Sequence, residues 1–192
     1  MKYIKDEEFL RGDCPMTKEE IRILSISKME LEEEHMVLDV GAGTGSVSIQ
    51  AALICSRGKV VAIEKDQEAL KTIYINKERF KAENLEVIEG LGAATLRNME
   101  EKFDSIFIGG SSGELKEIIE LSNHRLKYGG NMVLTFITLN NIHTAMDTLK
   151  KLGYKIQCTQ VSISKTRGQS YMLIALNPIF IVSGKKEIQE EA

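Results

Sequence analysis

Apolar residues along this chain form short continuous runs that are separated by stripes with helical spacing. The runs predict β-strands over residues 36–40, 59–63, 85–89, 104–108 and 131–137, because strands that are buried on both faces lack polar alternation. In the stripes, apolar residues mostly recur every three or four positions. The three stripes are Ala69, Leu70, Ile73 and Phe80; Leu115, Ile118, Ile119, Ser122 and Leu126; and Ile142, Ala145, Met146, Leu149 and Leu152. This alternation predicts an α/β fold with a mostly parallel sheet covered by helices on both faces.

The pattern changes after Gly153. Residues 155–163 and 170–176 both have strand character, and the segment between them is too short for a helix. We therefore expect a long antiparallel hairpin at the C-terminal end. The chain is polar after Gly184, and we expect residues 183–192 to form a flexible tail.

The length of 192 residues fits one α/β domain over residues 1–192, in which residues 1–34 would form an N-terminal cap. No stretch approaches the roughly 20 apolar residues of a membrane span, and the charged N-terminus is unlike a signal peptide. Cys14, Cys55 and Cys158 are scattered, as are the three histidines. We therefore expect a cytoplasmic protein with no metal site and no membrane partner.

The first apolar run, residues 37–40, leads directly into three glycines at alternate positions, Gly41, Gly43 and Gly45. Glycine is required where a chain turns sharply and a ligand contacts bare backbone. Glu64 follows 19 positions after Gly45, at the end of the next predicted strand, where a carboxylate can accept hydrogen bonds from both hydroxyls of a ribose. Together these features indicate a nucleoside-containing cofactor, although the glycines alone would also fit a tight strand-to-helix turn.

The glycine spacing separates two kinds of cofactor. Dinucleotide sites use G-x-G-x-x-G, whereas this chain has G-x-G-x-G with Asp39 two residues before the first glycine. The pattern resembles motif I of class I S-adenosylmethionine-dependent methyltransferases. That resemblance implies a Rossmann-like, seven-stranded fold in which the glycine loop passes under the methionine part of S-adenosylmethionine and Glu64 holds its ribose.

The N-terminal segment from Arg11 to Arg22 is the second informative stretch. Thr17 and Glu20 have the spacing of a capping box, which predicts a helix that starts after Pro15. A cap does not account for the sequence Arg-Gly-Asp-Cys-Pro-Met at residues 11–16. This sequence closely resembles the opening of the decarboxylating precorrin C-methyltransferases of cobalamin biosynthesis, which methylate carbon 15 of a precorrin ring and remove carbon dioxide from the acetate side chain on ring C.

The resemblance covers almost the whole chain. Residues 103–115 look like the family's glycine-rich turn after its fourth strand, and residues 177–180 are similar to its closing segment. The resemblance implies a homotetramer that acts on a tetrapyrrole, cobalt-precorrin-6B. It also implies a cofactor pocket lined by Thr17, Gly41, Ala42, Gly43, Thr44, Gly45, Glu64 and Gly92.

One position departs from the family pattern. Leu91 stands where the family usually carries an aspartate, which would meet the edge of the adenine ring. We therefore expect the adenine contact to come from backbone near Gly92.

The acceptor side is less clearly defined. Residues 109–113, Gly-Gly-Ser-Ser-Gly, could form a wall against a wide flat substrate or only a nest at a helix entry. A precorrin carries many carboxylates, so its pocket needs positive charge. The basic candidates, each of which also fits a surface or ion-pair role, are Arg11, Lys18, Arg22, Lys165 and Arg167. No residue is named as catalytic, because the conjugated ring can hold electrons during loss of carbon dioxide and the protein would contribute positioning and desolvation.

Three other functions fit parts of the pattern. A tRNA base methyltransferase on the same scaffold would need a basic face, whereas the net charge is −3 and the isoelectric point is about 5.8. We therefore expect no nucleic-acid partner. A dehydrogenase is disfavoured by the glycine spacing and the length. The third alternative is a non-catalytic cofactor-binding subunit, since the module also resembles one half of a larger methylase.

Overall fold

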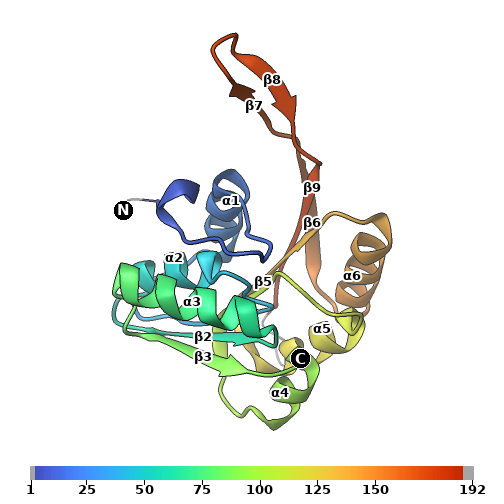
Figure 1. Cartoon of the computed structure of the whole chain (residues 1–192). Coiled ribbons are helices and arrows are strands. Elements are labelled where there is room, and N and C mark those ends of the chain that lie inside the picture. The colour runs from blue at the N-terminus through green and yellow to red at the C-terminus, as the bar shows by residue number, and fades with distance from the viewer. Residues whose placement is uncertain (1–2, 188–192) are drawn as a thin grey trace.

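The computed structural model describes residues 3–187, and its centre is a seven-stranded sheet (Figure 1). The strand order is β3-β2-β1-β4-β5-β9-β6, in which β9 is antiparallel to both neighbours while β1 to β5 run parallel. The strands of this sheet are β1 (Met36–Val40), β2 (Lys59–Glu64), β3 (Leu85–Glu89), β4 (Phe103–Ile108), β5 (Leu126–Phe136), β6 (Lys155–Val161) and β9 (Ile179–Lys185). The predicted mostly parallel α/β sheet is confirmed, and each of the five predicted strands overlaps one of β1 to β5.

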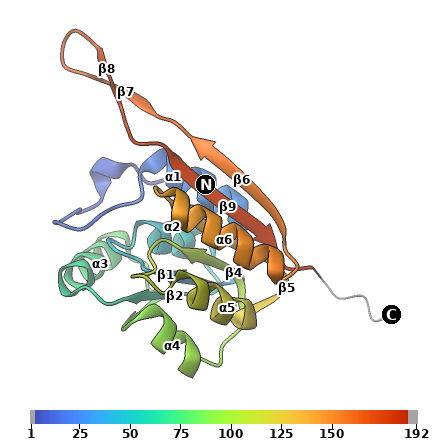
Figure 2. The same ribbon diagram turned by 90° about the vertical axis from the view of Figure 1, so that its right-hand side faces the viewer.

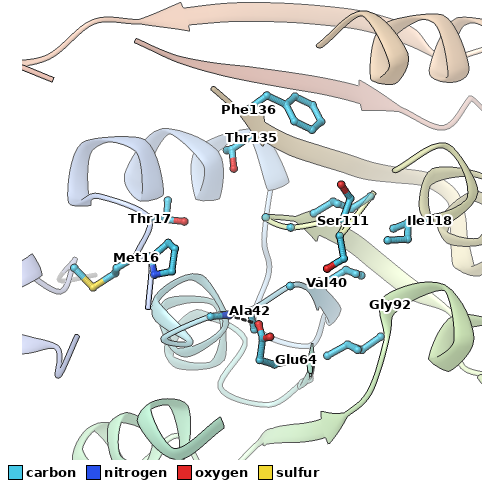
Figure 3. Close-up of a pocket in the computed structure, with 18 of the residues that line it drawn as sticks. Met16, Thr17, Val40, Ala42, Glu64, Gly92, Ser111, Ile118, Thr135 and Phe136 are labelled. Atoms are coloured by element: carbon cyan, nitrogen blue, oxygen red, sulfur yellow. Dashed lines mark hydrogen bonds between the residues drawn. The ribbon is translucent and has the colours of Figure 1, made fainter. Parts of the chain in front are cut away.

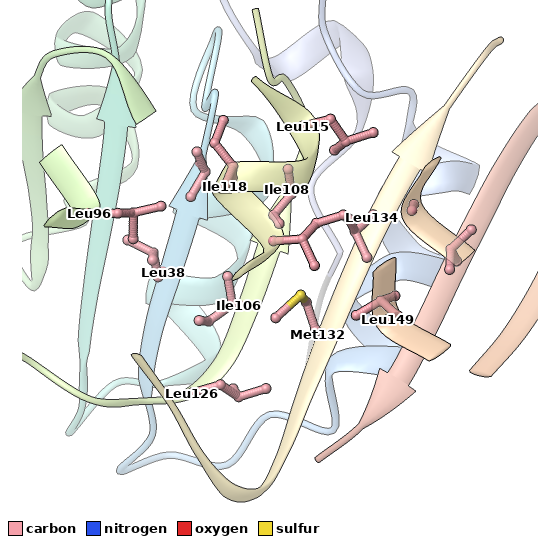
Figure 4. Close-up of a cluster of buried hydrophobic side chains, with 14 of the residues drawn as sticks. Leu38, Leu96, Ile106, Ile108, Leu115, Ile118, Leu126, Met132, Leu134 and Leu149 are labelled. Carbon is pink, nitrogen blue, oxygen red and sulfur yellow. The ribbon is translucent and has the colours of Figure 1, made fainter. Parts of the chain in front are cut away.

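Helices cover both faces of the sheet (Figures 1 and 2). They are α1 (Glu19–Met29), α2 (Ser46–Ile54), α3 (Gln67–Phe80), α4 (Gly92–Asn98), α5 (Leu115–Arg125) and α6 (Leu139–Lys151), preceded by a 3-10 turn, η1 (Asp6–Glu8). Helices α1 to α3 pack on one face and α4 to α6 on the other. Leu38 and Val40 of β1 face the second group, whereas Val37 faces the first. Figure 4 shows Leu38 in the cluster on that second side. Both faces of the strands are therefore buried, which fixes the positions of the strand ends.

The C-terminal hairpin is confirmed, but our assignment of its second strand was wrong. Residues 172–175 form β8 (Met172–Ala175), which pairs with β7 (Ser164–Arg167) in a separate two-stranded ribbon. The strand that enters the main sheet is β9, between β5 and β6. It lies there because Ile181 and Val182 are fully buried, one on each face. Figures 1 and 2 show the ribbon standing away from the rest of the molecule.

Two predicted boundaries also shift. Leu126, which we placed on a helical stripe, begins β5, because α5 ends at Arg125 and Leu126 is buried in register with Phe103. The expected tail began too early, since β9 continues to Lys185. The last part of that predicted tail, residues 188–192, lies outside the described residues.

The N-terminal segment crosses the α1–α3 side of the molecule and is held there by two buried polar side chains. Asn76 on α3 accepts from the backbone N–H of Leu10 and donates to its carbonyl, both at 2.8 Å. The fully buried Arg22 donates to Asp6 Oδ1 at 3.1 Å and to the carbonyls of Thr17 and Ile4. These bonds fix residues 4–17 as a cover over the ends of the parallel strands.

The predicted capping box was wrong. Helix α1 does begin after Pro15, but its N-cap is Lys18 and no side chain caps it. The hydrogen bond from Arg22 holds the carbonyl of Thr17, and the carboxylate of Glu20 pairs with Lys165 on the ribbon at 2.7 Å. Across residues 3–187, none of the helices combines the length and the apolar character needed to cross a bilayer.

Candidate functional site

A cleft of about 450 Å³ lies at the carboxyl ends of the parallel strands (Figure 3). Its floor and walls are the loops that follow β1, β2, β3 and β4, the end of β5, and the N-terminal segment at residues 15–18. Open α/β sheets bind ligands at this edge, where the strand order reverses and neighbouring loops separate. The reversal here falls between β1 and β4, because β2 and β3 lie on one side of β1 and β4 on the other.

The glycine loop after β1 touches the loop after β4 through bare backbone. Gly41 has φ +76°, and a Cβ atom there would lie 2.7 Å from both the Cα and the N of Gly110. The N–H groups of Gly41 and Ala42 both donate to the carbonyl of Ile63, at 2.9 and 3.2 Å. The loop is thus fixed between β2 and β4, and a side chain at position 41 would separate it from Gly110.

Glu64 ends β2 and has a carboxylate that is almost fully engaged with backbone. Its Oε2 accepts from the N–H of Gly43 at 2.8 Å, and its Oε1 accepts from Lys65 and Asp66 at 2.8 and 2.9 Å. Glu64 was predicted to hold a ribose, whereas its hydrogen bonds to these backbone N–H groups were not predicted. Because a carboxylate offers about four lone-pair positions, at least one remains for a ligand in the cleft that Glu64 lines.

Asp39 lies behind the glycine loop and is not among the residues that line the cleft. Its Oδ2 accepts from the hydroxyl of Ser48 on α2, and Oδ1 has no hydrogen-bond partner among residues 3–187. Burial, together with the nearby charge of Glu64, raises the pKa of Asp39 to about 7. Asp39 therefore joins β1 to the first turns of α2.

The structure brings together most of the predicted cofactor-site residues. Those that line the cleft are Thr17, Gly41, Ala42, Gly43, Glu64 and Gly92. Thr44 and Gly45 lie behind it, where Thr44 is buried and its carbonyl accepts from Asn76 at 3.0 Å. Gly45, with φ +75°, is the N-cap of α2, and a Cβ there would lie 2.4 Å from Ile73. Thr44 and Gly45 therefore shape the glycine loop and do not line the cleft.

Other cleft residues were not predicted. They lie beside Thr17, after β3, or near the end of β5, and they include Met16, Gly90, Thr135, Phe136, Ile137, Asn141 and Ile179. The carboxyl end of the predicted strand 131–137 was a signal that could have identified Thr135 to Ile137. The departing residue Leu91 is 46% exposed and does not line the cleft, whereas its neighbours Gly90 and Gly92 do.

The structure shows which of the residues predicted for the acceptor side line the cleft. Residues 109–112 line the cleft, so they occupy the position expected of a wall. Of the basic side chains, Arg22 is paired with Asp6 inside the protein and Lys165 is paired with Glu20. Arg11 lines a small separate hollow, and Arg167 is exposed on β7. Lys18 is the candidate that lines the cleft.

Metal binding has no visible site in the part of the chain described. Among residues 3–187, no three histidine, cysteine, aspartate or glutamate side chains gather in a way that could hold an ion.

The strand order, the glycine loop after β1 and the acid at the end of β2 define a methyltransferase of the class I fold. A family model described as the precorrin methyltransferase domain matches residues 8–186. The chain is 43% identical over 187 residues to a probable cobalt-precorrin-6B C(15)-methyltransferase (decarboxylating) from Sulfurisphaera tokodaii, covering 95% of this chain and 97% of that one. It is 39% identical over 188 residues to the cobalt-precorrin-6B C(15)-methyltransferase (decarboxylating) of Salmonella typhimurium, covering 96% of each.

The fold agrees with these sequence matches. The crystal structure of a precorrin-6y C5,15-methyltransferase from Geobacter metallireducens superimposes with a TM-score of 0.91 at 34% identity, covering 96% of both chains. The chain therefore belongs to the precorrin methyltransferase family. The resemblance drawn from residues 11–16, the glycine loop and the turn after β4 is confirmed.

The contact between Gly41 and Gly110 leads to a first prediction. Gly41→Ala should lower the free energy of unfolding by about 1–3 kcal/mol more than Gly129→Ala does. Both glycines have positive φ, +76° and +79°, so both variants carry backbone strain, but a Cβ at Gly129 meets nothing within 4 Å. Urea unfolding of the two variants and the parent protein measures the difference. Equal losses would show that the loops can separate at no cost.

Proposed function

We propose that this protein transfers a methyl group from S-adenosylmethionine to carbon 15 of cobalt-precorrin-6B and removes carbon dioxide from the ring C acetate, in cobalamin biosynthesis. The observation that carries the proposal is the identity of 39–43% to relatives with that name, over nearly the full length of both chains. It favours this function over a tRNA base methyltransferase or a non-catalytic subunit, for which the sequence offered only the shared scaffold.

The cofactor-site residues are also a proposal. We infer that Thr17, Gly41, Ala42, Gly43, Glu64 and Gly92 contact S-adenosylmethionine, while Thr44 and Gly45 hold the glycine loop from behind. Three features of the structure suit this group: a free lone pair on Glu64, a backbone floor at Gly41 to Gly43, and a cleft volume in the range of small-molecule sites. Backbone at Gly90 and Gly92 would meet the adenine, because these two residues line the cleft and Leu91 does not.

The chemistry needs no strong acid or base from the protein. When bound, S-adenosylmethionine supplies a methyl group whose bonding electrons remain on sulfur. The ring carbon supplies the pair for the new bond, and the pair left by carbon dioxide enters the conjugated ring. The ionisable side chains among the described residues that line the cleft are Lys18, Glu64 and Lys65. The residues of this chain would therefore act by holding the two reactants together and excluding water.

We also propose that the protein forms a homotetramer in the cytoplasm, with the β7–β8 ribbon as a contact between copies. An isolated two-stranded hairpin is marginally stable in water. In this ribbon the apolar residues Tyr171, Met172 and Leu173 are 76%, 58% and 67% exposed. A second copy that covers these side chains would remove their cost of exposure. The three free cysteines fit a reducing compartment.

The proposed reaction makes a direct prediction. Purified protein incubated with cobalt-precorrin-6B and S-adenosylmethionine should give a product that has gained one methylene unit and lost one carbon dioxide per turnover, as measured by mass spectrometry. Methylation of a protein or nucleic-acid amino group with the precorrin untouched would contradict the proposal.

The ribose assignment predicts a loss of affinity in Glu64→Gln. The neutral amide loses a charge-assisted hydrogen bond, so the Kd for S-adenosylhomocysteine should rise at least about tenfold. Titration calorimetry measures the Kd, with Glu68→Gln as a control on the exposed face of α3. Circular dichroism of the variant shows whether the loop has kept its fold, because Glu64 also accepts from the N–H of Gly43. An unchanged Kd would rule out the ribose contact.

The assembly proposal predicts that Leu173→Lys reduces the number of associated chains, because a charged side chain is costly to bury in an apolar contact. Light scattering of the purified protein should give four chains for the parent and fewer for the variant. Leu53→Lys changes an exposed leucine on α2 and should leave four. A parent that is monomeric would contradict the homotetramer, and a variant that stays tetrameric would place the contact elsewhere.

A further inference from the structure

The cleft extends beyond the residues assigned to the cofactor. On the side away from Glu64 and Gly92 it is bounded by the start of α1 and by the end of β5 (Figure 3). Figure 3 shows Thr17 and Thr135 on this side of the cleft, with the ring of Phe136 directed away from Thr17. We call this part, lined by Lys18, Phe136, Ile137 and Asn141, the outer end of the cleft.

Lys18 is the positive charge of the outer end. It is partly buried at the N-cap of α1, and its ammonium has no ion-pair or hydrogen-bond partner among residues 3–187. Of the other basic candidates, Arg22 is paired with Asp6 and Lys165 with Glu20, while Arg11 and Arg167 do not line the cleft. The Lys18 ammonium is not buried away from water, so water solvates it in the free protein, and an anionic group of a ligand can take the place of that water in a charge-assisted hydrogen bond.

The rim of the outer end is apolar. Ile137, which follows β5 and lines the cleft, is 68% exposed, and Leu139 close by in the chain is 75% exposed, whereas Phe136 is buried in the core. Exposed apolar residues at the rim of a pocket are typical of ligand contacts. A wide conjugated ring with carboxylate side chains could pack its apolar face against this rim and place a carboxylate at its edge beside Lys18.

We propose that Lys18 holds a carboxylate of the methyl acceptor and that Ile137 supports the face of its ring. This inference rests on the proposed function. The carboxylate at Lys18 is one that the product retains. An ion pair to the departing carboxylate would stabilise it before the reaction but not in the transition state, where its negative charge moves into the ring, and would therefore slow the loss of carbon dioxide.

The assignment is tested by Lys18→Gln, Lys18→Arg and Lys150→Gln. Lys150 is an exposed lysine near the end of α6, away from the cleft, and serves as the matched control. Lys18→Gln should raise both the KM and the Kd for cobalt-precorrin-6B about tenfold, while the Kd for S-adenosylhomocysteine stays within about twofold. Lys18→Arg should recover most of the loss, because it restores the charge. The ratio of decarboxylated to methylated product should not change.

The apolar part is tested in the same assays. Ile137→Asn should raise the KM for the precorrin several-fold, whereas Ile75→Asn, at a half-exposed isoleucine on α3, should not. Equal KM values for Ile137→Asn and the parent would remove Ile137 from the assignment.

The possible failures are distinguishable. Conversion of the precorrin by both the parent and Lys18→Gln with equal KM would overturn the role of Lys18 and leave the proposed function intact. Weaker binding of S-adenosylhomocysteine by Lys18→Gln would assign Lys18 to the cofactor instead. A higher decarboxylated fraction would place Lys18 at the departing carboxylate. If the parent neither binds nor converts the precorrin, the proposed function fails and this assignment fails with it.

Discussion

The cleft depends on the direct backbone contact between the loops that follow β1 and β4. Parallel strands bring these two loops to the same edge of the sheet, but side chains normally keep such loops apart. Here Gly41 and Gly110 meet without side chains, and Glu64 from β2 accepts from Gly43 in the same loop. Three strands thus fix one five-residue turn, so the floor of the cleft is set before any ligand arrives. Preorganisation of this kind reduces the entropy lost on binding.

The cover of the cleft depends on buried polar bonds. The N-terminal segment has few regular backbone pairs of its own, and Arg22 and Asn76 satisfy its carbonyls and N–H groups instead. Burying a guanidinium is costly unless it is fully paired, which Asp6 and two carbonyls achieve in part here. The same arrangement places Pro15 to Lys18 over the glycine loop. The position of the cleft wall is therefore specified by two residues, Arg22 and Asn76, that do not themselves line the cleft.

The sequence predicted those parts of the fold in which local pattern and tertiary environment agree. The strand before Gly41 and the acid at Glu64 were found because buried parallel strands read as continuous apolar runs. The second hairpin strand was misplaced because residues 172–175 have the same strand character as β9, and only the partner strands distinguish them. Arg22 was predicted as a possible substrate contact, because a sequence does not show that Asp6, 16 positions earlier, folds back to place its Oδ1 3.1 Å from the Arg22 guanidinium. Thr135 to Ile137 were missed for a related reason: their role follows from where β5 ends, which the apolar pattern locates only approximately.

The distribution of ionisable groups in the cleft bears on how decarboxylation can occur. Of the described lining residues, Glu64 is engaged by three backbone N–H groups and Lys65 is its neighbour, which leaves Lys18 on the outer side. Neither a histidine nor a free carboxylate from residues 3–187 lines the cleft to move a proton at the acceptor. The walls are instead backbone, hydroxyl and apolar groups, and a carboxylate that meets only the apolar part of such walls is destabilised relative to uncharged carbon dioxide. A cleft that holds the retained carboxylates by charge and leaves the departing one unpaired would therefore promote its loss by desolvation, with the ring as the acceptor of the electron pair.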